Sequence, residues 1–315
     1  MSAPIAASIA LTVTTTTTTT NAPAPNTLLG SAFLLGAAVC WGFGFYAQRV
    51  SIEHVTPLWA TALRFVIAAP IALAALAWRR RLGKRVPWKA GAVLGVLLYV
   101  AFALQTVAML HTPVSRVALI TGLYAVFVPL FQPLFGLKRP SLAQLVGVVV
   151  AVMALVLLCG VVGDQQALAV RPNIGDAYTL VMAVVSAVLV LLIGRLAPTE
   201  DAVSLNVVQI LSMCACSIFF APLIEGPPPS SLDATTLWSL LYLAVFSTFA
   251  AFLFQMLGQQ HVSPATASVL MLLETPIGVI AAVLILDEHM AGAQWVGAAL
   301  AVVAVAIAVV AERRA

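Results

Sequence analysis

Residues 264–286, PATASVLMLLETPIGVIAAVLIL, are the stretch from which the fold of this chain can be worked out. An α-helix rises ~1.5 Å per residue, so this run is long enough to cross the ~30 Å hydrocarbon core of a bilayer. Glu274 places one formal charge in its middle, where an ionisable group costs roughly 2.5–3.5 kcal/mol. Such residues face a bundle interior or a wet cavity, and we expect the same of Glu274.

The composition of the whole chain indicates an integral membrane protein. Of 315 residues, 62% are hydrophobic and 8% are charged, and the mean hydropathy is +1.08. A soluble domain carries about 25% charged residues, so this chain has too little polar surface to cover a globule. The pI near 9.1 does not indicate a nucleic-acid partner, because six of the 15 Lys and Arg residues lie in one short connection, 79–89.

Ten apolar segments follow a leader of low complexity. Residues 1–27 contain a run of threonines and no basic residue, so we expect a disordered leader. Each later segment has the length of a membrane-spanning helix. The segments are residues 28–48, 57–77, 89–110, 114–135, 141–162, 174–194, 202–224, 236–258, 264–286 and 291–311. The sequence therefore predicts an all-α polytopic membrane protein with ten transmembrane helices and a short tail, 312–315.

The positions of the basic residues predict how the chain is oriented. With the N-terminus in the cytoplasm, eleven Lys and Arg residues fall on the cytoplasmic side, and only Arg49, Arg116 and Arg171 fall on the other. Basic loops are retained in the cytoplasm, so both termini are expected there. The richness in Ala, Val and Leu favours a bacterial inner membrane.

An internal repeat relates the two halves of the chain. The sequence AFALQ at 101–105 recurs as AFLFQ at 251–255, and QLVG at 144–147 recurs as QWVG at 294–297. Both matches have an offset of 150 residues, and apolar sequences rarely share one register by chance over several segments. We therefore expect residues 28–162 and residues 174–311 to be two copies of one five-helix unit.

Five crossings in each unit have a geometric consequence. An odd number makes the second unit enter the membrane from the opposite side, so the units are expected to be inverted about an axis in the membrane plane. Inverted repeats are the recurring architecture of secondary transporters, whose substrate binds near the midplane between the halves. The sequence thus predicts a transporter that alternates access by moving one half against the other.

Four motifs add a family resemblance. They are WGFGF at 41–45, LRF at 63–65, FALQTVAMLHTPVSRVALITGLYAVFVPL at 102–130, and LLE at 272–274 with Glu288 fourteen residues after Glu274. Together they resemble the drug/metabolite transporter superfamily, and within it the ten-helix permeases built from two EamA domains. The resemblance covers about residues 28–310 and implies a permease for small metabolites, often an exporter, without specifying the substrate.

The chain departs from that family pattern at three places. Thr275 stands where the family commonly has proline, and Asp287 replaces the usual glycine before Glu288. In the first repeat, Lys138 stands where glutamate is frequent. These departures bear on substrate and coupling more than on the fold, so Thr275 belongs to the candidate site.

Glu274 is the strongest candidate for substrate or coupling chemistry. It could exchange a proton as the cavity alternates, or act as counter-ion for a cationic amine. The alternative is a neutral carboxyl group that hydrogen-bonds to a neighbouring helix. Gln105 and Gln255 occupy equivalent places in the third and eighth segments, where they either line a polar cavity or join helices by hydrogen bonds.

Three aromatic residues and one arginine complete the candidate set. Trp41, Tyr99 and Tyr124 are expected near the cavity, where aromatic faces can hold a ring or a cationic amine, although helix packing explains them equally well. Tyr124 is the counterpart of Glu274 in the first repeat. Arg64 could contact an anionic group, or it could snorkel or cap the carbonyls of another helix.

Other classes of function find little support in the sequence. No GxxxxGK[ST] loop is present to hold a nucleotide, and no HExxH or GxSxG motif indicates an intramembrane enzyme. A non-transporting receptor is an equally remote alternative. The histidines fall in loops and the cysteines in apolar runs, so we expect neither a metal site nor a cofactor.

The leading hypothesis is export of amino acids or related amphipathic compounds, and import of nucleosides, sugars or cofactor precursors is the alternative. The expected partners are a small-molecule substrate and the lipid bilayer. Small residues four apart, in 147–151 and 297–301, let helix backbones approach closely. They could support a homodimer or packing within one chain.

Overall fold

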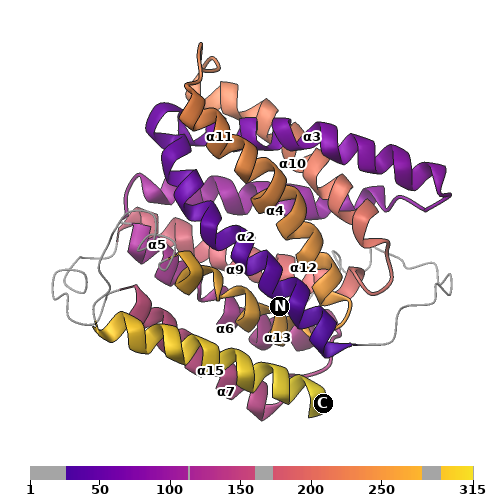
Figure 1. Ribbon diagram of the computed structural model, residues 1–315, viewed down its shortest axis with the longest axis vertical. Helices are drawn as coiled ribbons and strands as arrows, with labels where there is room; N and C mark the ends of the chain where they lie inside the picture. Colours follow the sequence, from indigo (N-terminus) through magenta and orange to yellow (C-terminus); the bar gives the residue numbers. More distant parts are fainter. Residues whose placement is uncertain (1–25, 113, 160–172, 279–291, 315) are drawn as a thin grey trace, which may run out of the picture.

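The structure, a computed structural model, describes residues 26–112, 114–159, 173–278 and 292–314. Within these ranges every regular element is a helix, and the helices pack side by side into one bundle (Figure 1). The first repeat contains α2 (Thr27–His54), α3 (Pro57–Arg81), α4 (Trp88–Met109), α5 (Val114–Thr121), α6 (Tyr124–Phe131), the 3₁₀ helix η1 (Gln132–Phe135) and α7 (Leu142–Leu158). The second contains α9 (Ile174–Leu196), α10 (Ala202–Glu225), α11 (Ala234–Tyr242), the π-helix η2 (Leu243–Ala250), α12 (Ala251–Gln259), α13 (Pro264–Met271) and α15 (Gly292–Arg314).

The all-helical membrane fold expected from the sequence is confirmed. In the described ranges, eight helical runs are long and apolar enough to cross a membrane, and α7 is a shorter apolar helix. Residues 1–25 of the expected leader and parts of three expected segments, 160–162, 279–286 and 291, lie outside the described residues, and Thr27 of the expected leader begins α2. α15 continues to Arg314, so residues 312–314 of the expected tail belong to its last turn.

Polar side chains at the helix ends explain where several helices begin. The Asn26 side chain accepts a hydrogen bond from the Leu29 N–H at the start of α2. Asn173 and Asp176 form a capping box at the start of α9, and Asp201 accepts from the Ser204 N–H in α10. These side chains pair amide groups that a helix leaves unsatisfied in its first turn.

The pairing of α3 with α10 shows that the repeats are inverted. Arg79, at the end of α3, forms an ion pair with Asp201, at the start of α10. At the other end of the pair, the Glu225 carboxylate accepts hydrogen bonds from the backbone N–H groups of Leu58 and Trp59 at 2.9 and 3.0 Å. The two helices are therefore antiparallel. Because each is the second helix of its repeat, the repeats run in opposite directions.

The pairing of α7 with α15 repeats this relationship and explains the small residues four apart. A Cβ on Gly147 would lie 3.5 Å from the Ala304 carbonyl, and a Cβ on Gly297 would lie 2.9 Å from the Ala154 carbonyl. Ala304 and Ala154 are themselves separated by the repeat offset of 150 residues. The small residues thus let two equivalent antiparallel helices of one chain approach closely.

Both repeats contain one broken helix, and the breaks are equivalent. Residues 122–123 separate α5 from α6, and residues 272–273 separate α13 from a second helical piece that is described as far as residue 278. At each break the hydrogen bonds tighten to three-residue spacing, from Leu123 N to Ile120 O and from Leu273 N to Leu270 O. Tyr124 and Glu274 are the first residues after the two breaks.

Two hydrophobic cores hold the bundle together, and neither belongs to one repeat. The first core is formed by α3, α4, α10, the α11–η2–α12 run and the end of α9. The second is formed by α6, α7, α13, α15 and parts of α2 and α9. Each core therefore mixes helices from both repeats.

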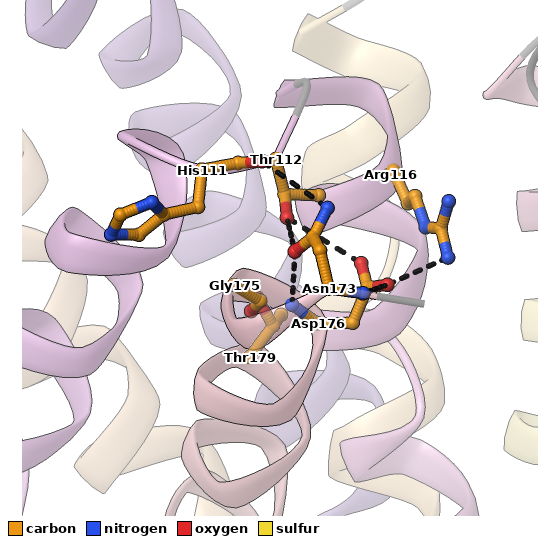
Figure 2. A network of polar contacts seen from close by, with 7 residues as sticks. All are labelled: His111, Thr112, Arg116, Asn173, Gly175, Asp176 and Thr179. Carbon is orange, nitrogen blue, oxygen red and sulfur yellow. Dashed lines mark hydrogen bonds and ion pairs between the residues drawn. The ribbon is translucent and has the colours of Figure 1, made fainter. Parts of the chain in front are cut away.

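A polar junction joins the two repeats at the end of the bundle away from the termini (Figure 2). Arg116, in α5, forms an ion pair of 2.6 Å with Asp176, in α9. The Thr112 hydroxyl donates to Asn173 Oδ1 at 2.7 Å. Gly175 allows this contact, because a Cβ there would lie 2.4 Å from the Thr112 hydroxyl.

An equivalent junction lies at the end that carries the termini. A Cβ on Gly30 would lie 2.7 Å from the His261 Cβ, as one on Gly175 would lie 3.0 Å from the His111 Cβ. Nearby, the Glu312 carboxylate of α15 accepts hydrogen bonds from the Ser263 N–H, at 2.8 Å, and from the Thr266 hydroxyl. The first turns of α5 and α13 are thus each tied to the bundle by a carboxylate, at opposite ends.

Candidate functional site

A cavity of about 200 Å³ lies between the two repeats. A single water needs about 10–15 Å³ by the same measure, so the cavity can hold a small organic molecule. Its walls combine apolar side chains with a few polar groups. The polar and charged side chains that line it are Gln48, Arg64, Gln105, Thr106, Thr121, Ser186, Gln209, Ser247, Gln255 and Glu274, together with Trp41 and Tyr124.

One face of α4 supplies a wall of this cavity. Leu98, Ala101, Phe102, Gln105 and Thr106 line it, with the three- and four-residue spacing of a single helical face. Tyr99 follows Leu98 by one residue, which turns its side chain about 100° away from this face.

Tyr99 is not among the lining residues of the cavity. It is buried and stacks on Phe220, with ring centroids 5.2 Å apart. Thr275 is also absent from the cavity wall, because it follows Glu274 by one residue on its helix. Of the residues that the sequence assigns to the site, these two lie away from the cavity.

Glu274 lines the cavity directly after the break in its helix. Its carboxylate forms no hydrogen bond or ion pair with any residue in the described ranges. Gly42 lets α2 pass close to the break, because a Cβ at that position would lie 3.0 Å from the Glu274 carbonyl. A charged or protonatable group therefore faces the cavity without a protein partner among these residues.

Tyr124 holds the equivalent position in the first repeat and is used differently. Its side chain is buried, and its hydroxyl donates a hydrogen bond of 3.4 Å to the Ser268 carbonyl in α13. It therefore links the broken helix of one repeat to that of the other.

Arg64 brings a cation to the cavity from α3. Its Nη2 donates to the Ser247 carbonyl at 2.9 Å and to the Ser247 hydroxyl at 3.2 Å, and its Nε donates to the Thr248 hydroxyl. Nη1 lies 3.4 Å from Gln48 Oε1, and the guanidinium lies 5.2 Å from the centre of the Phe102 ring. Arg64 thus caps a carbonyl of another helix, and none of the carboxylates in the described ranges pairs with it.

The π-helix η2 provides the carbonyl that anchors Arg64. The same Ser247 carbonyl also accepts a hydrogen bond of 3.0 Å from the indole N–H of Trp41. The Trp41 ring meets Phe252 edge to face, with centroids 5.3 Å apart. Short π-helical segments are frequent at functional sites, and this one fixes both an aromatic and a cationic side chain at the cavity.

The two glutamines selected for their symmetry both line the cavity. Gln255 donates to Gln259 Oε1 at 3.2 Å, and Gln259 donates to the Val190 carbonyl at 2.8 Å. Gln105 makes no hydrogen bond within the described part of the chain. Of these two amides, that of Gln255 is hydrogen-bonded to its neighbours, and that of Gln105 lines the cavity without such a bond to any described residue.

Sequence reasoning missed several lining residues that carried a usable signal. Gln48 lies seven residues after Trp41, on the same helical face. Gln209 is an amide in the middle of the apolar α10, a placement that by itself indicates a polar surface or a site. Within the described residues, no three His, Cys, Asp or Glu side chains gather in a way that could hold a metal ion.

The fold and the cavity define a polytopic membrane permease with inverted repeats. The family model described as "EamA-like transporter family" matches the chain twice, over residues 28–160 and 173–310. The chain belongs to this family, which is a family of transporters.

Individual relatives agree with this assignment. The chain is 25% identical over 270 residues to an uncharacterized transporter of Archaeoglobus fulgidus, which covers 86% of this chain and 82% of the relative. It is 24% identical over 286 residues to the uncharacterized inner membrane transporter YedA of Escherichia coli, covering 89% and 90%. It is also 24% identical over 254 residues to the protein PagO of Salmonella typhimurium, covering 77% and 80%.

A solved crystal structure of a protein shares the fold. It superimposes with a TM-score of 0.78 at 21% identity, over 90% of this chain and 98% of the other. At that identity the similarity concerns the fold alone. The chain is therefore a multi-pass membrane transporter of the EamA-like family.

Proposed function

We propose that this transporter exports small zwitterionic metabolites of the amino-acid type through the cavity between its repeats. Glu274 binds the cationic group of the solute or exchanges a proton for it, and Arg64 contacts the anionic group. Gln105 and Gln255 contribute hydrogen bonds, and Trp41 contributes an aromatic face.

The observation that carries the proposal is a pair of opposite charges on one cavity. Glu274 and Arg64 both line it, and neither forms an ion pair with a residue in the described ranges. A charge held away from water is unfavourable unless it is paired. A solute with one positive and one negative group supplies a partner for each.

The remaining wall suits a solute that is also partly apolar. The apolar side chains of Phe102, Phe252, Leu98 and Ile193 line the cavity beside the polar groups. Burial of apolar surface gives roughly 25 cal/mol per Å², so an aliphatic or aromatic side chain would add to the binding free energy. These features favour amphipathic compounds over sugars.

The two broken helices support alternating access. α5 lies towards the end away from the termini and α13 towards the end with the termini, and each hinges at a break beside the cavity. Arg116–Asp176 fastens α5, whereas Glu312 fastens α13. If only the Arg116–Asp176 ion pair or only the Glu312 hydrogen bonds broke, the cavity would open to one side of the membrane. Discontinuous helices line the substrate site of other transporters in a similar way.

Binding to the purified full-length protein tests the charge requirement. Leucine should raise the midpoint of thermal unfolding, whereas leucine methyl ester, which lacks the negative charge, and N-acetyl-leucine, which lacks the positive charge, should not. If all three stabilise the protein equally, the two-charge site is wrong.

Proteoliposomes that contain only this protein test transport and its direction. Leucine preloaded inside should exchange with labelled leucine outside, above the rate in protein-free liposomes. The distribution of basic residues predicts that both termini lie in the cytoplasm. In right-side-out and inside-out membrane vesicles alike, net transport of leucine should therefore run from the cytoplasmic face of the protein to its outer face. Net movement only in the reverse direction would contradict export.

A further inference from the structure

Gln209 is a buried amide that the proposed charge pair leaves unused. It lies in α10, lines the cavity, and its side chain is 0% exposed. Neither its Oε1 nor its Nε2 has a hydrogen-bond partner within the described part of the chain. A buried polar group without a partner is strongly unfavourable, so each case in a native fold calls for an explanation.

Other buried amides in the described residues are bonded, which makes Gln209 distinct. Gln144 donates to Ser263, Thr266 and Glu312. The remaining buried amides also donate to protein oxygens, and they are Gln132, Asn206, Gln255 and Gln259. Gln132 Oε1 and Asn206 Oδ1 lack a partner, but each of those side chains still makes one hydrogen bond, whereas at Gln209 both amide atoms lack a partner among the described residues.

Close packing holds Gln209 in place. A Cβ on Gly95 would lie 2.5 Å from the Gln209 carbonyl oxygen, and a Cβ on Gly91 would lie 2.5 Å from the Val208 Cβ. The two glycines of α4 thus bring α10 close against it. The neighbouring residues Val207, Val208 and Ile210 of α10 are buried as well, so Gln209 does not lie on the outer surface of the bundle.

Counted from the start of its helix, Gln209 corresponds to Arg64, although the two are 145 residues apart and the later helices of the repeats are offset by 150. Arg64 is the eighth residue of α3 and Gln209 the eighth residue of α10, and these are the second helices of the two repeats. Because the repeats are inverted, the two side chains lie about 10 Å from opposite ends of the bundle by helix rise. They therefore border the cavity on opposite sides of its middle.

We propose that Gln209 is a specificity-determining residue that binds a neutral hydrogen-bonding group on the side chain of the transported solute. This inference rests on the proposed function, since it requires the solute to occupy this cavity. With the anionic group at Arg64 and the cationic group at Glu274, the solute side chain extends towards Gln209. The amide presents a donor and an acceptor together, which matches a hydroxyl or a carboxamide group.

A second unpaired group on the same cavity supports the assignment. The Thr121 hydroxyl, at the end of α5, also lines the cavity without a hydrogen-bond partner in the described ranges. A site built to hydrogen-bond a substrate hydroxyl rejects the analogue that lacks it, because the protein groups are then left unpaired. The transporter should therefore prefer a hydroxylated solute over its apolar isostere.

Threonine and valine are the probes, since they have nearly the same shape and differ by one hydroxyl. The purified full-length protein should be stabilised by threonine at concentrations at least tenfold lower than by valine, and proteoliposomes should show the same preference in exchange. Gln209→Met, which keeps the length of the side chain, should bring the ratio of threonine exchange to valine exchange close to one.

Two further variants separate binding from packing. Gln132→Met makes the same change at a buried glutamine that does not line the cavity, and it should leave the threonine preference intact. Gln209→Asn keeps the amide and should retain part of the preference even if Gln209→Met lowers the folded yield.

The outcomes distinguish this inference from the proposed function. If the wild-type protein binds and exchanges both amino acids without preference, or if the preference survives Gln209→Met, the role of Gln209 is wrong and the proposed function stands. If the wild-type protein neither binds nor exchanges any amino acid, both are overturned.

Discussion

The broken helices of the two repeats have the same backbone and different chemistry. Each breaks after eight helical residues, and each resumes two residues later beside the cavity. In the first repeat the second piece begins with Tyr124, whose hydroxyl donates a hydrogen bond to the Ser268 carbonyl. In the second repeat it begins with Glu274, whose carboxylate forms no hydrogen bond with any described residue. Duplication preserved the hinge, and the residue at the hinge diverged. The comparison suggests that function is located where the repeats differ.

The strongest test of this comparison is to remove the carboxylate of Glu274 and, separately, the hydroxyl of Tyr124. Glu274→Gln should reduce leucine exchange by about 100-fold, equivalent to ~2.7 kcal/mol, and abolish its dependence on pH, because the amide neither ionises nor neutralises a cation. Tyr124→Phe should reduce exchange by less than about threefold, because it removes one weak hydrogen bond. Initial rates in proteoliposomes at matched protein density measure both. Equal losses for the two variants would mean that the repeats are not specialised.

The residue within the break provides a second test. Gly122 opens the break in the first repeat, and its counterpart in the second is Leu272. A Cβ on Gly122 would lie 2.0 Å from the Leu155 Cδ2. Gly122→Leu should therefore destabilise the protein by about 1–3 kcal/mol through overpacking. The midpoint of thermal unfolding in detergent measures this change.

A partner substitution controls that experiment. Leu155→Ala in the Gly122→Leu background creates room for the new side chain and should recover part of the lost stability. An additive loss in the double variant would show that Leu155 is not the obstacle.

The smallest effect is expected away from the cavity. Tyr99 stacks on Phe220 and lies off the lining face of α4, so Tyr99→Leu should leave leucine exchange within about twofold of wild type. The loss of the aromatic pair should lower stability by about 0.5–1.5 kcal/mol. A change in substrate preference in this variant would show that Tyr99 contributes to substrate binding.

The sequence predicted the architecture because architecture depends on patterns that recur. The lengths of the apolar segments predicted the membrane crossings, and the 150-residue offset predicted the repeat. Five crossings in each repeat predicted the inversion, which is seen in the contacts of Gly147 and Gly297. Gln105 and Gln255, which share this offset, both lie on the cavity wall. For these features, local residue type and spacing suffice.

Other features depend on tertiary contacts that no local pattern specifies. The break at 272–273 contains two leucines, which are good helix formers, and the nearby Pro276, which cannot donate a hydrogen bond to the Leu272 carbonyl, was not read as its mark. The placement of Tyr99 outside the cavity depends on which face of α4 meets its neighbours, and the hydrophobic sequence of α4 is nearly uniform around the helix. Gln209 was overlooked because its equivalent is Arg64, a different residue type, so a search for identical residues could not find it.

The sharing of both hydrophobic cores between the repeats has a consequence for biosynthesis. Each core needs helices from both repeats, so neither core can be complete when only the first five segments have been inserted. The chain therefore reaches its stable fold late, after α15 has joined α7. Cutting the gene between α7 and α9 should give two polypeptides that are degraded when made singly and that reassemble when made together, as two subunits of an ancestral dimer would.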